Sequence, residues 1–166
     1  MSCNRFDYIL GDLSFMNREV PYEDGFLQML QFEESWNQNM DQPFFPSWIN
    51  VLDESMMEWF NKWAPRFMCV GRKPHPFDNE RHTICCDLPS ILWREQIMEG
   101  KDSPTELGKK KWEDLGNTVG LMLRICEPIF STGKCVVFYS GFFVSKGITA
   151  LLEFGVYAAA FVKKRK

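Results

Sequence analysis

The sequence predicts an α/β protein in which a helical lead-in precedes a mixed β-sheet. Three observations predict this class. Apolar residues recur at helical spacing as far as Met40. Two predicted strands, residues 81–87 and 91–97, are joined by the turn around Leu88-Pro89-Ser90, as in a hairpin. After residue 133 the chain alternates strand, helix and strand, which is typical of a β-α-β unit with parallel strands.

The lead-in is predicted to span residues 1–45 and to contain two helices separated at 17–21. Two prolines in the segment 42–46 cannot continue a helix, so we expect a boundary there, followed by an α/β unit over 46–166. The apolar residues at helical spacing are Phe6, Ile9, Leu10 and Leu13 in the first helix, and Phe26, Met29, Leu30, Trp36 and Met40 in the second.

The α/β unit opens with a predicted buried strand, residues 48–53, that ends on Asp53. A short strand is expected at 67–70, within an irregular stretch, and the hairpin follows. The last elements are a strand at 134–139, a short helix that Ser145 caps and Gly155 ends, and a strand at 156–162.

A long helix is predicted between the hairpin and the strand at 134–139. Ser103 can cap it, Pro104 suits its first position, and Glu106 can complete a capping box. Gly133 can end it in the left-handed conformation. Its buried residues are expected to be Leu115, Val119, Met122, Cys126 and Ile129. A strand, a hairpin and a β-α-β unit, in this order, match the ribonuclease H-like fold.

Composition narrows the class of protein. The 166 residues are 45% hydrophobic, which suffices for a folded core and excludes a disordered chain. No stretch of 18 residues lacks a charge, so a membrane-spanning helix is not expected. The N-terminus lacks the apolar core of a signal peptide, so we expect an intracellular protein whose 6 cysteines are reduced thiols.

The charge is unevenly distributed along the chain. Residues 1–60 carry 2 basic and 11 acidic side chains, a net of −9, whereas residues 61–166 carry 17 basic and 11 acidic, a net of +6. The last four residues are Lys163-Lys164-Arg165-Lys166. A basic half is compatible with binding a polyanion, and also with a solvated, charged surface.

Three groups of residues are candidates for a metal-binding or catalytic site. A carboxylate at a strand end, such as Asp53, can hold Mg²⁺ or simply begin a turn. A zinc site from Cys69, His75, His82, Cys85 and Cys86 is not expected, because the spacings are loose and the adjacent cysteines point to opposite faces. A catalytic triad is not expected either, since the sequence contains no nucleophile elbow and has 2 histidines.

Several segments together resemble the piggyBac family of transposases. Residues 5–15 are similar to the family's R-F-x-x-I-x-x-x-L-x-F helix, and Val51-Leu52-Asp53-Glu54 is similar to its D-E strand. The other matching segments are Lys73–Phe77, Cys85–Asp87, Leu121–Phe130 followed by Gly133, Gly141–Ser145, Leu151–Ala158 and the basic segment 163–166. The resemblance covers about residues 5–166.

The resemblance implies a DNA transposase of the nucleus, in which three aspartates hold two Mg²⁺ ions that act on a phosphodiester. Asp53 matches the first aspartate. The second aspartate falls on Tyr139 or Ser140, neither of which is acidic, and the third lies beyond this chain. We therefore expect an incomplete ribonuclease H-like core that does not cut DNA. Arg72, Lys73 and the basic segment 163–166 are the candidates for phosphate contacts.

Alternatives to this hypothesis remain open. The chain could be a domesticated DNA- or protein-binding module, or a fragment of a decayed element without function. An enzyme is a further alternative, which requires that a longer chain or a partner supply the missing carboxylate. A small-molecule substrate is not expected. Part of the parallel sheet would lack a covering helix, which favours self-association.

Overall fold

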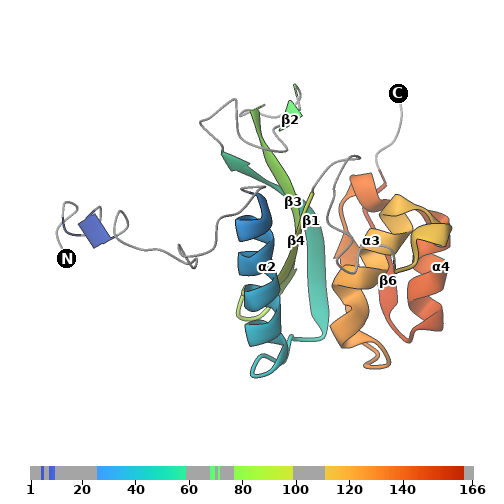
Figure 1. Cartoon of the computed structure of the whole chain (residues 1–166). Helices are drawn as coiled ribbons and strands as arrows, with labels where there is room; N and C mark the ends of the chain where they lie inside the picture. Colours follow the sequence, from blue (N-terminus) through green and yellow to red (C-terminus); the bar gives the residue numbers. More distant parts are fainter. Residues whose placement is uncertain are drawn as a thin grey trace.

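The computed structural model describes residues 26–58, 68, 69, 71, 77–98 and 111–162, and also residues 5, 8 and 9. Its strands form one six-stranded mixed sheet with helices packed against it (Figure 1). The strands are β1 (Ile49–Glu58), β2 (Met68–Cys69), β3 (Phe77–Cys86), β4 (Leu92–Ile97), β5 (Cys135–Phe138) and β6 (Tyr157–Ala160). The helices are α2 (Phe26–Asp41), α3 (Asn117–Cys126) and α4 (Ser145–Glu153), with 3₁₀ turns η1 (Glu113–Leu115), η2 (Glu127–Ile129) and η3 (Ser140–Phe142).

The strand order is β2-β3-β1-β5-β6, with β4 also paired to β3. The pairs β1–β3 and β3–β4 are antiparallel, so the predicted hairpin is confirmed. The pairs β1–β5 and β5–β6 are parallel, as predicted for the β-α-β unit. Of the first predicted helix, the structure describes residues 5, 8 and 9, which are helical.

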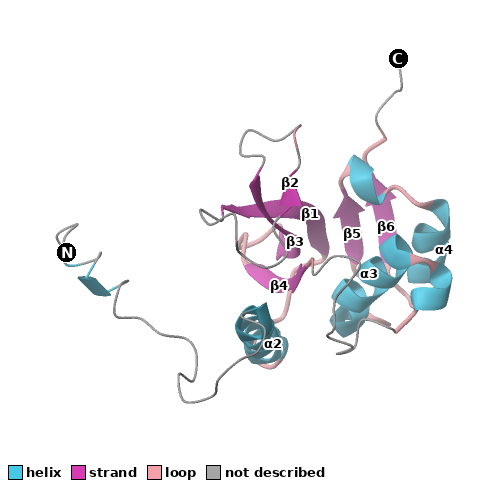
Figure 2. Cartoon of the chain, turned by 45° about the horizontal axis from the view of Figure 1, so that its top comes forward, coloured by secondary structure: helices cyan, strands magenta, loops and turns pink. Residues whose placement is uncertain are grey.

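The two faces of the sheet differ in burial. Because successive strand residues point to opposite faces, Leu52 and Phe138 share one face, which we call the covered face. Here α3 and α4 pack on the strands, and the hydrophobic core includes Leu52, Phe138, Met122 and Leu151 (Figure 2). Val51, Val137 and Ala159 lie side by side on the opposite face, which we call the open face. Val51 is 39% exposed there, next to the half-buried Val137.

The prediction of one long helix from Ser103 to Gly133 is wrong within the described residues. Trp112 and Gly116 have positive φ angles of 64° and 99°, which interrupt any helix, and α3 begins at Asn117. The helix ends at Cys126 because Pro128 offers no N–H, and the chain continues as the turn η2. Residues 101–110, which contain the predicted helix start, lie outside the described residues. The predicted burial of Val119, Met122, Cys126 and Ile129 is confirmed, and Leu115 is half-buried.

The prediction that Ser145 caps α4 is also wrong. Val144 occupies the cap position, and Ser145 is the first helical residue without a capping side-chain bond. Val144 can take this role because its extended backbone leads directly out of the turn η3, and its carbonyl accepts bonds from the N–H groups of Gly147 and Ile148. Gly155 follows the helix with φ 71°, as the sequence predicts.

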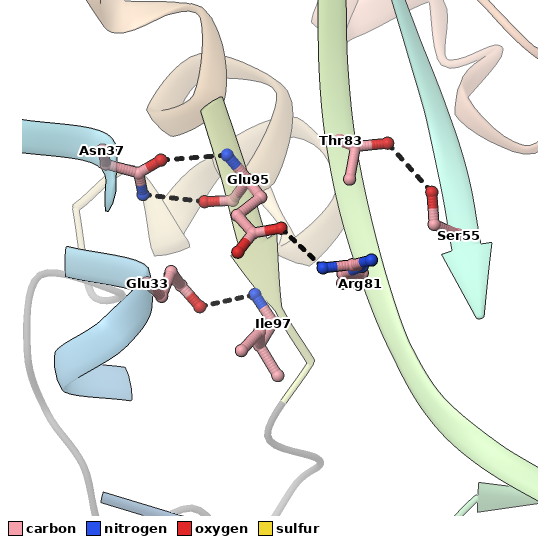
Figure 3. A network of polar contacts seen from close by, with 7 residues as sticks. All are labelled: Glu33, Asn37, Ser55, Arg81, Thr83, Glu95 and Ile97. Atoms are coloured by element: carbon pink, nitrogen blue, oxygen red, sulfur yellow. Dashed lines mark hydrogen bonds and ion pairs between the residues drawn. The ribbon is translucent and has the colours of Figure 1, made fainter. Parts of the chain in front are cut away.

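Helix α2 lies along the outer edge of β4 and satisfies its unpaired backbone groups. The Asn37 amide donates to the Glu95 carbonyl at 2.8 Å and accepts from the Glu95 N–H at 3.0 Å. The Ile97 N–H donates to the Glu33 carboxylate at 2.7 Å (Figure 3). An unpaired strand edge is a template for pairing with another chain, and here side chains from the lead-in occupy it.

None of the described helices is both long and apolar enough to cross a membrane. The cysteines for which the structure describes a state, Cys69, Cys85, Cys86, Cys126 and Cys135, are free, in agreement with the expected reduced thiols.

Candidate functional site

Asp53 is not at the end of its strand, so that part of the prediction is wrong. Strand β1 continues to Glu58 because its antiparallel pairing with β3 extends that far. The parallel pairing with β5, however, ends at Leu52 and Phe138. Asp53 is therefore the first residue of β1 beyond the parallel ladder, half-buried on the open face, and its carboxylate accepts a bond from the Glu54 N–H at 2.8 Å.

Two of the described side chains next to Asp53 on the open face, Thr83 and Ser55, carry hydroxyls. Thr83 lies directly opposite on β3 and shares a 3.0 Å hydrogen bond with Ser55. Tyr139 follows β5, and its N–H donates to the Leu52 carbonyl at 3.4 Å. The Tyr139 side chain is 53% exposed, and its ring stacks on Phe161 at 6.1 Å between centroids.

These residues do not fit a two-metal phosphodiester site. Such a site needs several carboxylates around two divalent ions, because neutral ligands offset little of their charge. Within the described part of the chain, the group of side chains close enough to share a metal does not include Asp53. Both positions proposed for the second aspartate carry a hydroxyl instead of a carboxylate. Tyr139 is exposed, and Ser140 is the first residue of η3.

The candidate phosphate-binding residues cannot be placed. Arg72, Lys73 and the segment Lys163-Lys164-Arg165-Lys166 all lie outside the described residues, as does His75. Their role stays a prediction from the sequence.

A different cluster lies on the covered face, on the other side of the sheet from Asp53. Glu54 of β1 is directly opposite His82 of β3, and Glu80 precedes His82 by two residues and therefore shares its face. Their potential ligand atoms all lie within 4.8 Å of one another. The long strand β1 and its register with β3 position all three side chains.

His82 is the buried member of this cluster. Burial lowers its pKa to about 4, so the imidazole is neutral at pH 7 although Nε2 lies 3.5 Å from the Glu80 carboxylate. The ring packs edge-on against Phe142 at 5.1 Å between centroids. Its Nδ1 is buried without a hydrogen-bond partner.

This cluster was not among the candidates predicted from the sequence, where His82 was a possible zinc ligand or catalytic histidine. One signal was available, since Glu80 and His82 are separated by one residue and must share a face if the segment is a strand. Glu54 could not be added, because its pairing with His82, 28 positions further along the chain, depends on the register between two strands.

The fold and the sequence both connect this chain to transposases. A strand, a hairpin and a parallel β-α-β unit form a ribonuclease H-like fold, here with a partial sheet. The piggyBac transposase in a synaptic complex with hairpin DNA, known from a cryo-EM structure, has a similar fold, with a TM-score of 0.73 at 15% sequence identity. The similarity covers 100% of this chain and 34% of that one, so the chain spans about a third of that transposase's length.

The sequence matches the transposase family described as Transposase IS4 over residues 1–166. The chain therefore belongs to this family and is a transposase-derived domain. A search among curated proteins gives no match.

Proposed function

We propose that this chain is a piggyBac-like, transposase-derived domain that binds DNA and does not cut it. The observation that carries the proposal is the surroundings of Asp53, where Thr83 and Ser55 lie on the same face and positions 139 and 140 carry a tyrosine and a serine instead of an aspartate. A lone carboxylate cannot assemble two Mg²⁺ ions and align a phosphodiester between them. Asp53 is then a vestigial ligand of the ancestral site, which bound Mg²⁺.

DNA binding is supported by charge and by similarity. Residues 61–166 carry a net charge of +6, and the basic segment 163–166 follows the last strand. The structurally similar piggyBac transposase is in a complex with hairpin DNA. Lys and Arg side chains that neutralise phosphates release counterions, which supplies affinity without sequence specificity. Action on DNA also implies a location in the nucleus.

One experiment tests both DNA binding and the absence of cleavage. It uses the purified chain and a labelled DNA hairpin with Mg²⁺ or Mn²⁺. We expect salt-sensitive binding and no strand nicking, with identical results for Asp53→Asn. Replacing all four residues 163–166 with glutamine should reduce the slope of log affinity against log salt by up to about 4, since each phosphate contact contributes about 0.9. Lys146→Gln, an exposed lysine of α4, is the matched control and should change little.

Nicking that requires both a divalent metal and Asp53 would overturn the inactive assignment. Absence of DNA binding would instead favour a decayed fragment or a module that binds protein.

Self-association is a second proposal, supported by the open face of the parallel strands. Tyr139, Tyr157 and Phe161 are all more than half exposed, and parallel sheets are usually covered on both faces. We expect sedimentation velocity to show a concentration-dependent dimer, which Phe161→Lys weakens by placing a charge on this face. Val162→Lys, at a neighbouring exposed residue, is the comparison; a monomer at every concentration would contradict the proposal.

A further inference from the structure

We propose that Glu54, Glu80 and His82 form a binding site for one divalent transition-metal ion, separate from the ancestral site at Asp53. The site lies on the covered face of the sheet, whereas the Asp53 side chain belongs to the open face. It depends neither on DNA nor on any cleavage activity.

The geometry of the cluster is close to that of a bound ion. Three ligands at about 2.1 Å from one metal lie about 3.0–3.6 Å from one another. The three side chains already bring their ligand atoms within 4.8 Å of one another, so a shift of about 1 Å or less in each side chain closes them around an ion. The ladder between β1 and β3 holds the three backbone positions, and only side-chain torsions need to change.

The donor set selects the kind of metal. Two carboxylates and one neutral imidazole form a mixed oxygen and nitrogen set, which suits Mn²⁺ and Zn²⁺ better than Mg²⁺, an ion that prefers oxygen ligands alone.

Two features of the surroundings support a ligand at this position. His82 is 5% exposed, and its Nε2 already faces the Glu80 carboxylate at 3.5 Å, so the buried ring presents one nitrogen to the cluster. In addition, the turn η3 presents a glycine to Glu54. A Cβ at Gly141 would lie 2.8 Å from Glu54 Oε1, so a larger residue would displace this carboxylate from the cluster.

Equilibrium dialysis of the chelator-treated full chain against Mn²⁺, Zn²⁺ or Mg²⁺, without DNA, tests the proposal. We expect one Mn²⁺ or Zn²⁺ per chain and weaker binding of Mg²⁺. Glu54→Gln and Glu80→Gln should each weaken binding by more than about tenfold, a loss at least as large as that caused by removing an outer-shell partner. Glu153→Gln, an exposed glutamate of α4, is the matched control and should bind as the unaltered chain does.

A spectroscopic measurement identifies the imidazole ligand. Bound Mn²⁺ should show nitrogen coupling in pulsed electron paramagnetic resonance, and His82→Gln should remove it. If His82→Gln fails to fold, the two near-isosteric glutamate variants decide the matter, with their circular dichroism as the folding check. The proposal is overturned if no ion binds, if the glutamate variants bind like the control, or if Asp53→Asn abolishes binding while Glu54→Gln does not.

Discussion

Phe138→Ala should lower the free energy of unfolding by about 3–5 kcal/mol, the usual cost of truncating a buried phenylalanine. Phe138 is 1% exposed, at the end of β5, where its ring lies 6.3 Å from that of Phe142. Phe142 in turn packs on His82. The cavity would therefore weaken both the core and the turn that covers the glutamate–histidine cluster.

Urea denaturation monitored by tryptophan fluorescence measures this loss. Val137→Ala is the matched control, since Val137 precedes Phe138 on the same strand but is half-buried on the open face. We expect the control to cost about 1 kcal/mol or less, because fewer buried atoms are removed. Equal losses in the two variants would show that the two faces do not differ as described.

Arg81→Ala should lower the free energy of unfolding by about 3 kcal/mol, because it leaves a buried carboxylate without its cation. Arg81 forms an ion pair with Glu95 at 2.9 Å, and the Glu95 side chain is only 5% exposed (Figure 3). The Arg81 side chain is 28% exposed and bonds Glu95 through one nitrogen, Nη1, so we place the loss at the lower end for buried pairs.

The double variant Arg81→Ala/Glu95→Gln separates charge from packing. Removing the uncompensated charge should restore more than half of the stability lost in Arg81→Ala. Thermal unfolding of the single and double variants over pH 5–8 provides the comparison. If the double variant is no more stable than Arg81→Ala, the ion pair is not the source of the effect.

Much of the architecture could be predicted from local patterns. Alternation and turn residues located the hairpin, and the Val- and Phe-rich segment near 135 located β5. The helix preceding β5 was predicted too long, because a capping box at Ser103 outweighed the helix-breaking potential of Gly116 and Pro128. The backbone at Gly116 has a positive φ that a glycine tolerates but does not require, so the residue type alone could not reveal the break.

Of the candidate sites, one could be predicted from the sequence and one could not. Asp53 was found from sequence because an acidic residue follows an apolar strand, and Tyr139 beside it was found by resemblance. The glutamate–histidine cluster was not found, since its members come from β1 and β3 and meet only through the register Glu54–His82. Register is a tertiary property, and a shift of one residue would move Glu54 to the opposite face from His82.

The sequence by itself determined the order of the elements and the class of the sheet. These properties depend on residue type and local spacing, which are fully present in one dimension. The tertiary structure decided that β1 runs past Asp53, that α2 occupies the edge of β4, and that Glu54, Glu80 and His82 lie together. Each of these depends on which strands pair and in which register, because burial and hydrogen bonding between distant segments decide those contacts.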